Sequence, residues 1–128
     1  MLNLPESLNR FLSPEECSQI DQTLLPTRDR FSIRITVYSW RYLQVISQGL
    51  GVAIADLQPQ QIMDWLRQDD QMQSLDAQDK SFVDWFGNLL TASLSPLQKI
   101  AQQADVGIEQ LTLQQIIDWF TDQVKAAL

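Results

Sequence analysis

Two aspartate–tryptophan pairs are the residues whose types and spacing could support chemistry. Asp64-Trp65 recurs 54 residues later as Asp118-Trp119. Two carboxylates brought together could act as a general acid and base, or could hold a divalent cation. Adjacent side chains on a helix point about 100° apart, so core tryptophans would leave the aspartates at the rim. We therefore expect tryptophans that anchor the core and solvated aspartates that accept hydrogen bonds, in preference to a metal site or a catalytic pair.

The rest of the composition contains few residues suited to catalysis. The chain has no histidine, which removes the most common general base and transition-metal ligand. Its single cysteine, Cys17, has no partner for an intrachain disulfide, and its four glycines form no phosphate-binding loop. We predict a protein that is not an enzyme, with no catalytic residue, no metal site and no cofactor.

A group of arginines in an acidic chain is the second candidate site. The net charge is −7, yet residues 22–55 contain four arginines and one aspartate and so carry +3. On a helix, three of these arginines would share a face with a tyrosine, and arginine and aromatic side chains are enriched at protein interfaces. The predicted interaction residues are Arg30, Arg34, Tyr38, Trp40 and Arg41. We expect them to dock onto a partner protein that has an acidic surface, so that the chain acts as an interaction or adaptor module.

Three other interpretations of the basic residues stay open. They could pair inside the protein with acids of its second half, for example Asp76 or Asp79, or they could face the acidic surface of a second copy in a homodimer. The segment 28–41 could also contact nucleic acid as part of a regulatory protein. The acidity of the whole chain argues against this last role, because phosphate backbones attract basic surfaces.

Residues 43–66 and 97–120 are copies of one sequence unit. They are identical at 12 of 24 positions without a gap. Both copies contain the pattern Val-x-Ile-x-x-Leu, which we expect to fold a tight or 3₁₀ turn back onto the core. Each copy is then a helix, a short connection and a second helix, and it needs a neighbour to cover its apolar face. The basic segment lies before the first copy and is not repeated.

Capping patterns divide the chain into helices. Ser13-Pro14-Glu15-Glu16 and Thr112-Leu113-Gln114-Gln115 have the residues of capping boxes, and Ser95-Pro96 repeats the serine and proline of the first. Thr27 and Asp76 are two further candidate caps. Behind these positions, apolar residues recur with the three-and-four spacing of helices.

Residues 30–38 have two conflicting patterns. Apolar and polar residues alternate from Phe31 to Val37, which favours a strand. A helix from about Arg28 to Gly49 also fits, with an apolar stripe that includes Phe31, Ile35 and Tyr38. A lone strand would have no partner for its backbone hydrogen bonds. We therefore predict a helix.

These patterns together predict an all-α protein. We expect a compact single domain over residues 1–128, a bundle of about six helices built from a diverged tandem helix-turn-helix repeat. No apolar run is long enough to span a membrane, and the first ten residues lack the pattern of a secretory signal. With one cysteine, these features favour a cytoplasmic protein.

Overall fold

A computed structural model describes residues 12–79 and 81–128. These ranges contain six α-helices and no β-strand, so the predicted all-α fold of about six helices is confirmed. The segment on which the expectation about a secretory signal rests lies outside the described residues. The elements, with η for a 3₁₀ helix, are α1 (Pro14–Asp21), α2 (Thr27–Leu50), η2 (Ile54–Asp56), α3 (Pro59–Gln68), α4 (Asp70–Gln78), α5 (Phe82–Ala104), η3 (Ile108–Gln110) and α6 (Leu113–Ala126).

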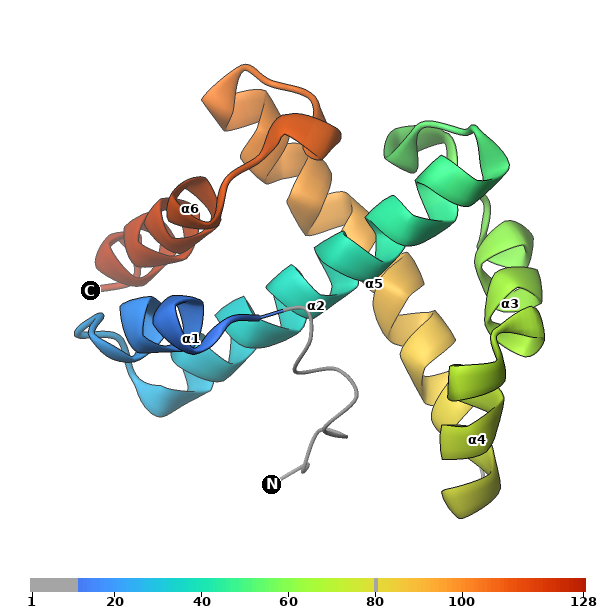
Figure 1. Ribbon diagram of the computed structural model, residues 1–128. Coiled ribbons are helices and arrows are strands. Elements are labelled where there is room, and N and C mark those ends of the chain that lie inside the picture. The colour runs from blue at the N-terminus through green and yellow to red at the C-terminus, as the bar shows by residue number, and fades with distance from the viewer. Residues whose placement is uncertain (1–11, 80) are drawn as a thin grey trace.

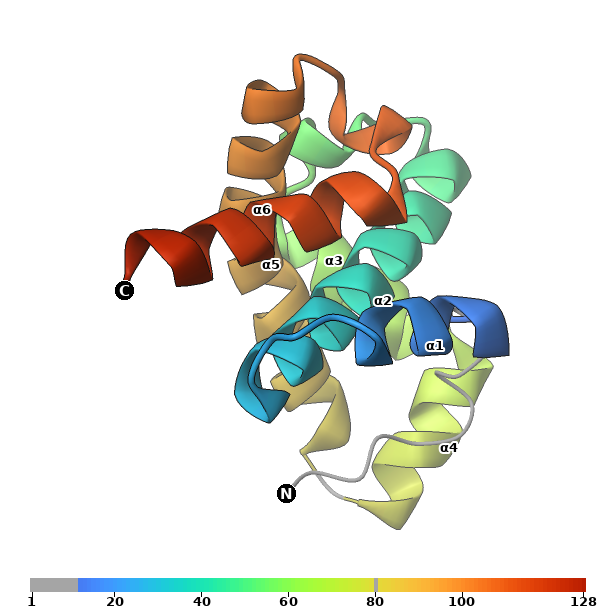
Figure 2. The ribbon, with the colours of Figure 1, turned by 90° about the vertical axis from the view of Figure 1, so that its left-hand side faces the viewer.

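The two longest helices, α2 and α5, cross near the centre of the molecule (Figure 1). Helices α3 and α4 lie on one side of the crossing and α1 and α6 on the other, where Figure 2 shows α1 and α6 next to each other. The rings of Tyr42 on α2 and Phe86 on α5 meet edge to face with centroids 5.4 Å apart. Both side chains are buried, so this contact lies inside the hydrophobic core.

The ambiguous residues 30–38 belong to α2, as predicted. Ile33, Val37 and Leu43 of this helix have no exposed surface, and its neighbours α1, α5 and α6 pack on several sides. The stripe that predicted the helix is only half correct, because Phe31 and Ile35 are partly exposed. A helix that is covered on more than one side buries apolar residues at irregular intervals, which explains the strand-like alternation.

The two copies of the repeat have matching elements 54 residues apart. Gly51 and Asp105 both end a long helix with positive φ angles, 67° and 56°. Each is followed by the predicted 3₁₀ turn, η2 or η3, and then by a second helix. Helix α3 packs on α5 of the other copy, and α6 packs on α2. The second helix of each copy thus packs on the long helix that contains the start of the other copy, while the origin of the copies from one duplicated unit stays a prediction.

Two predicted capping boxes are confirmed. The hydroxyl of Ser13 accepts a hydrogen bond from the backbone N–H of Glu16, and the Glu16 carboxylate accepts one from the Ser13 N–H. Thr112 and Gln115 make the same reciprocal pair at the start of α6. Such caps are local because both partners lie within one turn of helix.

The other predicted caps differ from the structure. Thr27 is the first residue of α2, after Pro26, and does not cap it. Asp76 lies within α4, a helix that the sequence did not predict, and its carboxylate accepts from the N–H of Val83 at the start of α5. Ser95 begins no helix, because α5 continues through Pro96. The buried stripe of α5 extends on both sides of this proline, so burial outweighs the lost backbone hydrogen bond.

Candidate interaction surface

The predicted interaction residues all lie on α2, and the structure brings two of their three arginines against α1. Arg34 pairs with Asp21 and Arg41 pairs with Glu16, both acids of α1. The strip is therefore at least partly internal, as one interpretation of the sequence allowed. Its acidic partners are on α1, however, and not at the suggested positions in the second half of the chain.

Arg41 makes the stronger of the two ion pairs. Its two terminal nitrogens donate to the two oxygens of Glu16 at 2.7 and 2.5 Å, and about a quarter of each side chain is exposed. The hydrogen bond from Arg41 lowers the pKa of Glu16 to about 2, and the backbone N–H of Ser13 adds to the effect. Glu16 correspondingly raises the pKa of Arg41. A bidentate pair of this kind fixes geometry as well as charge.

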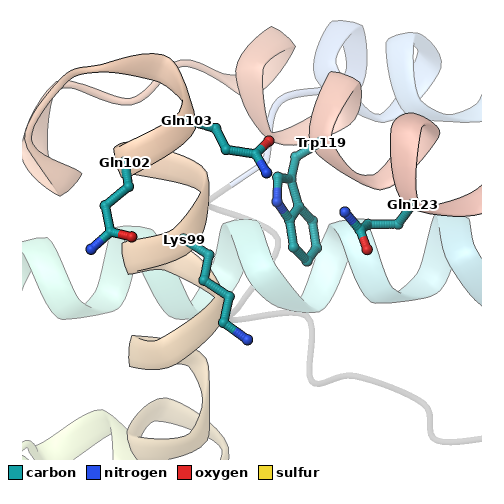
Figure 3. A pocket seen from close by; sticks show the side chains of 5 residues that line it. All are labelled: Lys99, Gln102, Gln103, Trp119 and Gln123. Carbon is teal, nitrogen blue, oxygen red and sulfur yellow. The ribbon is translucent and has the colours of Figure 1, made fainter. Parts of the chain in front are cut away.

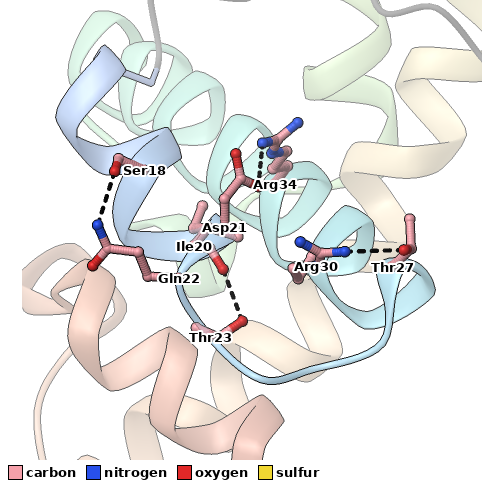
Figure 4. Close-up of polar contacts among 8 residues, drawn as sticks. All are labelled: Ser18, Ile20, Asp21, Gln22, Thr23, Thr27, Arg30 and Arg34. Carbon is pink, nitrogen blue, oxygen red and sulfur yellow. Dashed lines mark hydrogen bonds and ion pairs between the residues drawn. The ribbon is translucent and has the colours of Figure 1, made fainter.

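The other two arginines make more exposed contacts. Arg34 donates to Asp21 at 2.6 Å, but the side chains are 34% and 49% exposed. A pair in this setting contributes roughly 0–1 kcal/mol to stability. Arg30 donates to the hydroxyl of Thr27 at 3.0 Å (Figure 4). Arg30 thus makes its described hydrogen bond within α2, at the end of that helix nearest the α1–α2 loop.

The two aromatic residues of the strip are buried in the free protein. Tyr38 is 4% exposed and Trp40 is 6% exposed. Burial raises the pKa of Tyr38. The indole N–H of Trp40 donates to the carbonyl of Ile108 at 2.9 Å, and the Arg41 guanidinium lies 5.5 Å from the indole centre. Trp40 thus connects α2 to the second half of the chain, and both rings offer little surface to a partner.

The loop between α1 and α2 presents an apolar side chain that the sequence analysis missed. Leu24 is fully exposed, whereas its neighbour Leu25 packs against the core. The hydroxyl of Thr23 donates to the carbonyl of Ile20 at 2.7 Å and so ties the loop to the end of α1 (Figure 4). Arg28, at the start of α2, is exposed as well. No sequence pattern distinguishes the outward leucine from the inward one.

The aspartate–tryptophan pairs do not form a joint site. Asp64 belongs to α3 and Asp118 to α6, and these two helices lie on opposite sides of the α2–α5 crossing (Figure 1). Each accepts a hydrogen bond at 2.8 Å from the glutamine four residues earlier. Their tryptophans, Trp65 and Trp119, are partly buried and pack against the edge of the core. Within residues 12–79 and 81–128, no three potential metal ligands gather into one group.

The sequence matches one known protein family over most of its length. A model of the family described as NDH complex assembly factor CRR9 matches residues 12–127, which include all six helices. The chain belongs to this family. No curated protein and no solved structure matches it. Among the described residues, no helix combines the length and the hydrophobicity that a membrane crossing requires.

Proposed function

We propose that this protein is a non-enzymatic assembly factor that binds a protein component of an NDH complex. The family match over residues 12–127 is the observation that carries the proposal. An assembly factor acts by binding protein surfaces. The structure fits this role, because Arg34 and Arg41 pair with acids of α1, and Asp64 and Asp118 bond to nearby glutamines without forming a shared catalytic or metal site. We also propose a cytoplasmic location, which the single cysteine supports.

We propose further that docking uses the basic end of α2 and the loop before it. Leu24 and Arg28 are exposed there, and Arg30 is partly exposed. An apolar side chain beside cations is suited to an apolar pocket with an acidic rim, and the cations would steer the encounter. The ion pairs that Arg34 and Arg41 make with α1 would hold this loop in place. Of the predicted strip, this surface keeps only Arg30; it adds Arg28 and has Leu24 in place of the buried aromatic residues.

Binding to purified NDH complex tests the proposal. The protein is immobilised, and its affinity for the complex and for separated subunits is measured by biolayer interferometry. We expect Leu24→Ser and Arg28→Glu each to weaken binding about tenfold, or about 1.4 kcal/mol. Arg67→Glu makes the same charge change at an exposed position of α3 and should leave the affinity unchanged.

The outcomes separate the parts of the proposal. A wild-type protein that binds neither the complex nor any subunit would contradict the assembly role. Equal affinities for the wild type and the Leu24 and Arg28 variants would contradict the docking surface alone. Binding to mixed-sequence duplex DNA that weakens steeply with salt and is lost in Arg28→Glu would favour the nucleic-acid alternative. Sedimentation that depends on protein concentration would favour the homodimer.

A further inference from the structure

Trp119 lines two adjoining hollows between α5 and α6. The larger has a volume of about 430 Å³ and is also lined by Lys99, Gln102, Gln103 and Gln123. Gln103 and Gln123 point toward the indole from the two helices (Figure 3). The indole N–H of Trp119 is buried and has no hydrogen-bond partner among the described residues. A buried donor without an acceptor is unusual in a folded protein and distinguishes this part of the α5–α6 contact from the rest of the core.

The first copy of the repeat shows how this hollow arises. Trp65 is the counterpart of Trp119, and Gly49 is the counterpart of Gln103. A Cβ atom on Gly49 would lie 2.2 Å from the Cη2 atom of Trp65, so the indole of the first copy packs directly onto the glycine backbone. Gln103 has a side chain where that indole would sit. Trp119 therefore cannot take the corresponding position, and space remains beside it.

The same comparison shows that the larger hollow has gained hydrogen-bond donors. Val45 of the first copy corresponds to Lys99, and Asp69 corresponds to Gln123. Asp69, three residues beyond the first copy, has structural partners of its own, because it caps α4 and accepts a hydrogen bond from a tyrosine hydroxyl. In the second half of the chain, a lysine, three glutamines and a tryptophan line the larger hollow, without a carboxylate. The lining of this hollow therefore has a positive charge, whereas the whole chain has a net charge of −7.

We propose that the larger hollow binds an acidic peptide segment of a partner protein. A carboxylate of the segment faces Lys99, an adjacent apolar side chain lies on the Trp119 ring, and glutamine amides pair with the peptide backbone. The inference rests on the proposed function for the source of the segment. The volume of the larger hollow suits two or three peptide residues. A small free anion would make only one ion pair there, with the solvated ammonium of Lys99, and would bind weakly.

The smaller hollow determines which way the segment lies. It has a volume of about 240 Å³, shares Gln103 and Trp119 with the larger one, and is also lined by Asp118 and Asp122. These aspartates repel a carboxylate, so the acidic residue of the segment can lie only on the Lys99 side. A basic residue of the same segment would be favoured on the aspartate side.

Nuclear magnetic resonance with a defined peptide tests the site. The probe is acetyl-Asp-Leu-Asp-Leu-amide, and the readout is the indole N–H resonance of Trp119, which the Trp119→Phe variant assigns. We expect this resonance to shift to saturation, and the dissociation constant to rise at least about tenfold when asparagine replaces aspartate in the peptide. No shift, or an equal affinity for the two peptides, would overturn the proposal.

Matched variants locate the binding energy. Lys99→Glu should abolish binding of the peptide, whereas Lys125→Glu, which makes the same change outside both hollows, should leave it intact. The triple variant Lys99→Val, Gln103→Gly, Gln123→Asp carries the residues found 54 positions earlier in the chain and should also lose binding. If the triple variant does not fold, Lys99→Glu still decides, because Lys99 is exposed on the surface. Wild-type affinity in Lys99→Glu would overturn the inference.

The peptide experiment and the NDH-complex experiment test the two proposals independently, so either proposal can be contradicted while the other holds. Binding of the peptide by a protein that ignores the NDH complex would retain the hollow as a site and reject the assembly role. Equal binding of the complex by the wild type and Lys99→Glu, without any response to the peptide, would reject the hollow and retain the assembly role.

Discussion

Arg41 of α2 holds the carboxylate of Glu16 in α1 with both terminal guanidinium nitrogens. The same carboxylate accepts the backbone N–H of Ser13, so one side chain caps α1 and fastens it to α2. An arginine that its sequence context assigned to a binding surface thus stabilises the fold. The pair fixes α1 against α2, and α1 leads directly into the α1–α2 loop, whose Leu24 we propose as a contact.

Replacement of Glu16 by glutamine should reduce stability in a way that depends on pH. The folded-state pKa of Glu16 is lowered from 4.5 to about 2, so its contribution is complete above pH 4.5 and is lost as pH falls toward 2. We expect Glu16→Gln to cost about 1 kcal/mol at pH 7 and the difference from wild type to shrink through that window. Urea unfolding at several pH values measures it.

Glu15→Gln is the matched control for that experiment. Glu15 occupies the same first turn of α1 and is exposed. Its replacement removes one charge from the helix start and should cost only a few tenths of a kcal/mol. A constant gap between wild type and Glu16→Gln from pH 7 to pH 2.5 would contradict the assigned ion pair.

Trp40→Phe should weaken the connection between the two halves of the chain. The indole N–H of Trp40 donates to the buried carbonyl of Ile108, and phenylalanine keeps most of the apolar contact without the donor. An unpaired buried carbonyl costs about 1–3 kcal/mol, which is the expected loss in the free energy of unfolding. Chemical denaturation measures the loss, and a change below about 0.5 kcal/mol would show that water replaces the indole.

Gly87→Ala should destabilise the contact between α3 and α5. A Cβ atom on Gly87 would lie 2.1 Å from the sulfur of Met63 and 3.3 Å from Cδ1 of Leu66. Relief of this overlap costs about 1–3 kcal/mol, more than the roughly 1 kcal/mol that alanine gains in helix propensity. We expect a lower melting temperature. Asn88→Ala, at the exposed neighbouring position, makes a comparable propensity change without the overlap and should raise it.

Local patterns predict most of this fold because the partners they describe are close in sequence. The capping boxes at Ser13 and Thr112 and the 3₁₀ turns of both copies each depend on residues within one or two turns. Helix α4 was missed because only Met72 of its residues is buried, so it has no apolar stripe to detect. Asp76 caps a helix that starts beyond its own, which a local pattern cannot show.

The candidate site was harder to predict because exposure is decided by tertiary packing. The sequence of α2 places Arg34, Tyr38 and Arg41 on one side, but it does not show that α1 covers that side. Helix α1 covers that side because the α1–α2 loop reverses the direction of the chain and places α1 against α2. The hollow beside Trp119 was not predicted either. The repeat was recognised from positions that are identical in both copies, whereas the hollow is lined by residues that differ between them, such as Lys99 and Gln103.

Pro96→Ala should stabilise the protein. Pro96 lies inside α5, where it has no N–H to donate to the carbonyl four residues earlier and its ring crowds that carbonyl. Alanine restores the hydrogen bond, but it also raises the conformational entropy of the unfolded chain, which offsets about 0.4–1 kcal/mol of the gain. We expect a net increase of about 1–2 kcal/mol in the free energy of unfolding, by urea titration. Ser95→Ala, at the exposed position before it, should change stability by less than about 0.5 kcal/mol. An unchanged or lower free energy of unfolding for Pro96→Ala would mean that α5 accommodates its proline without cost.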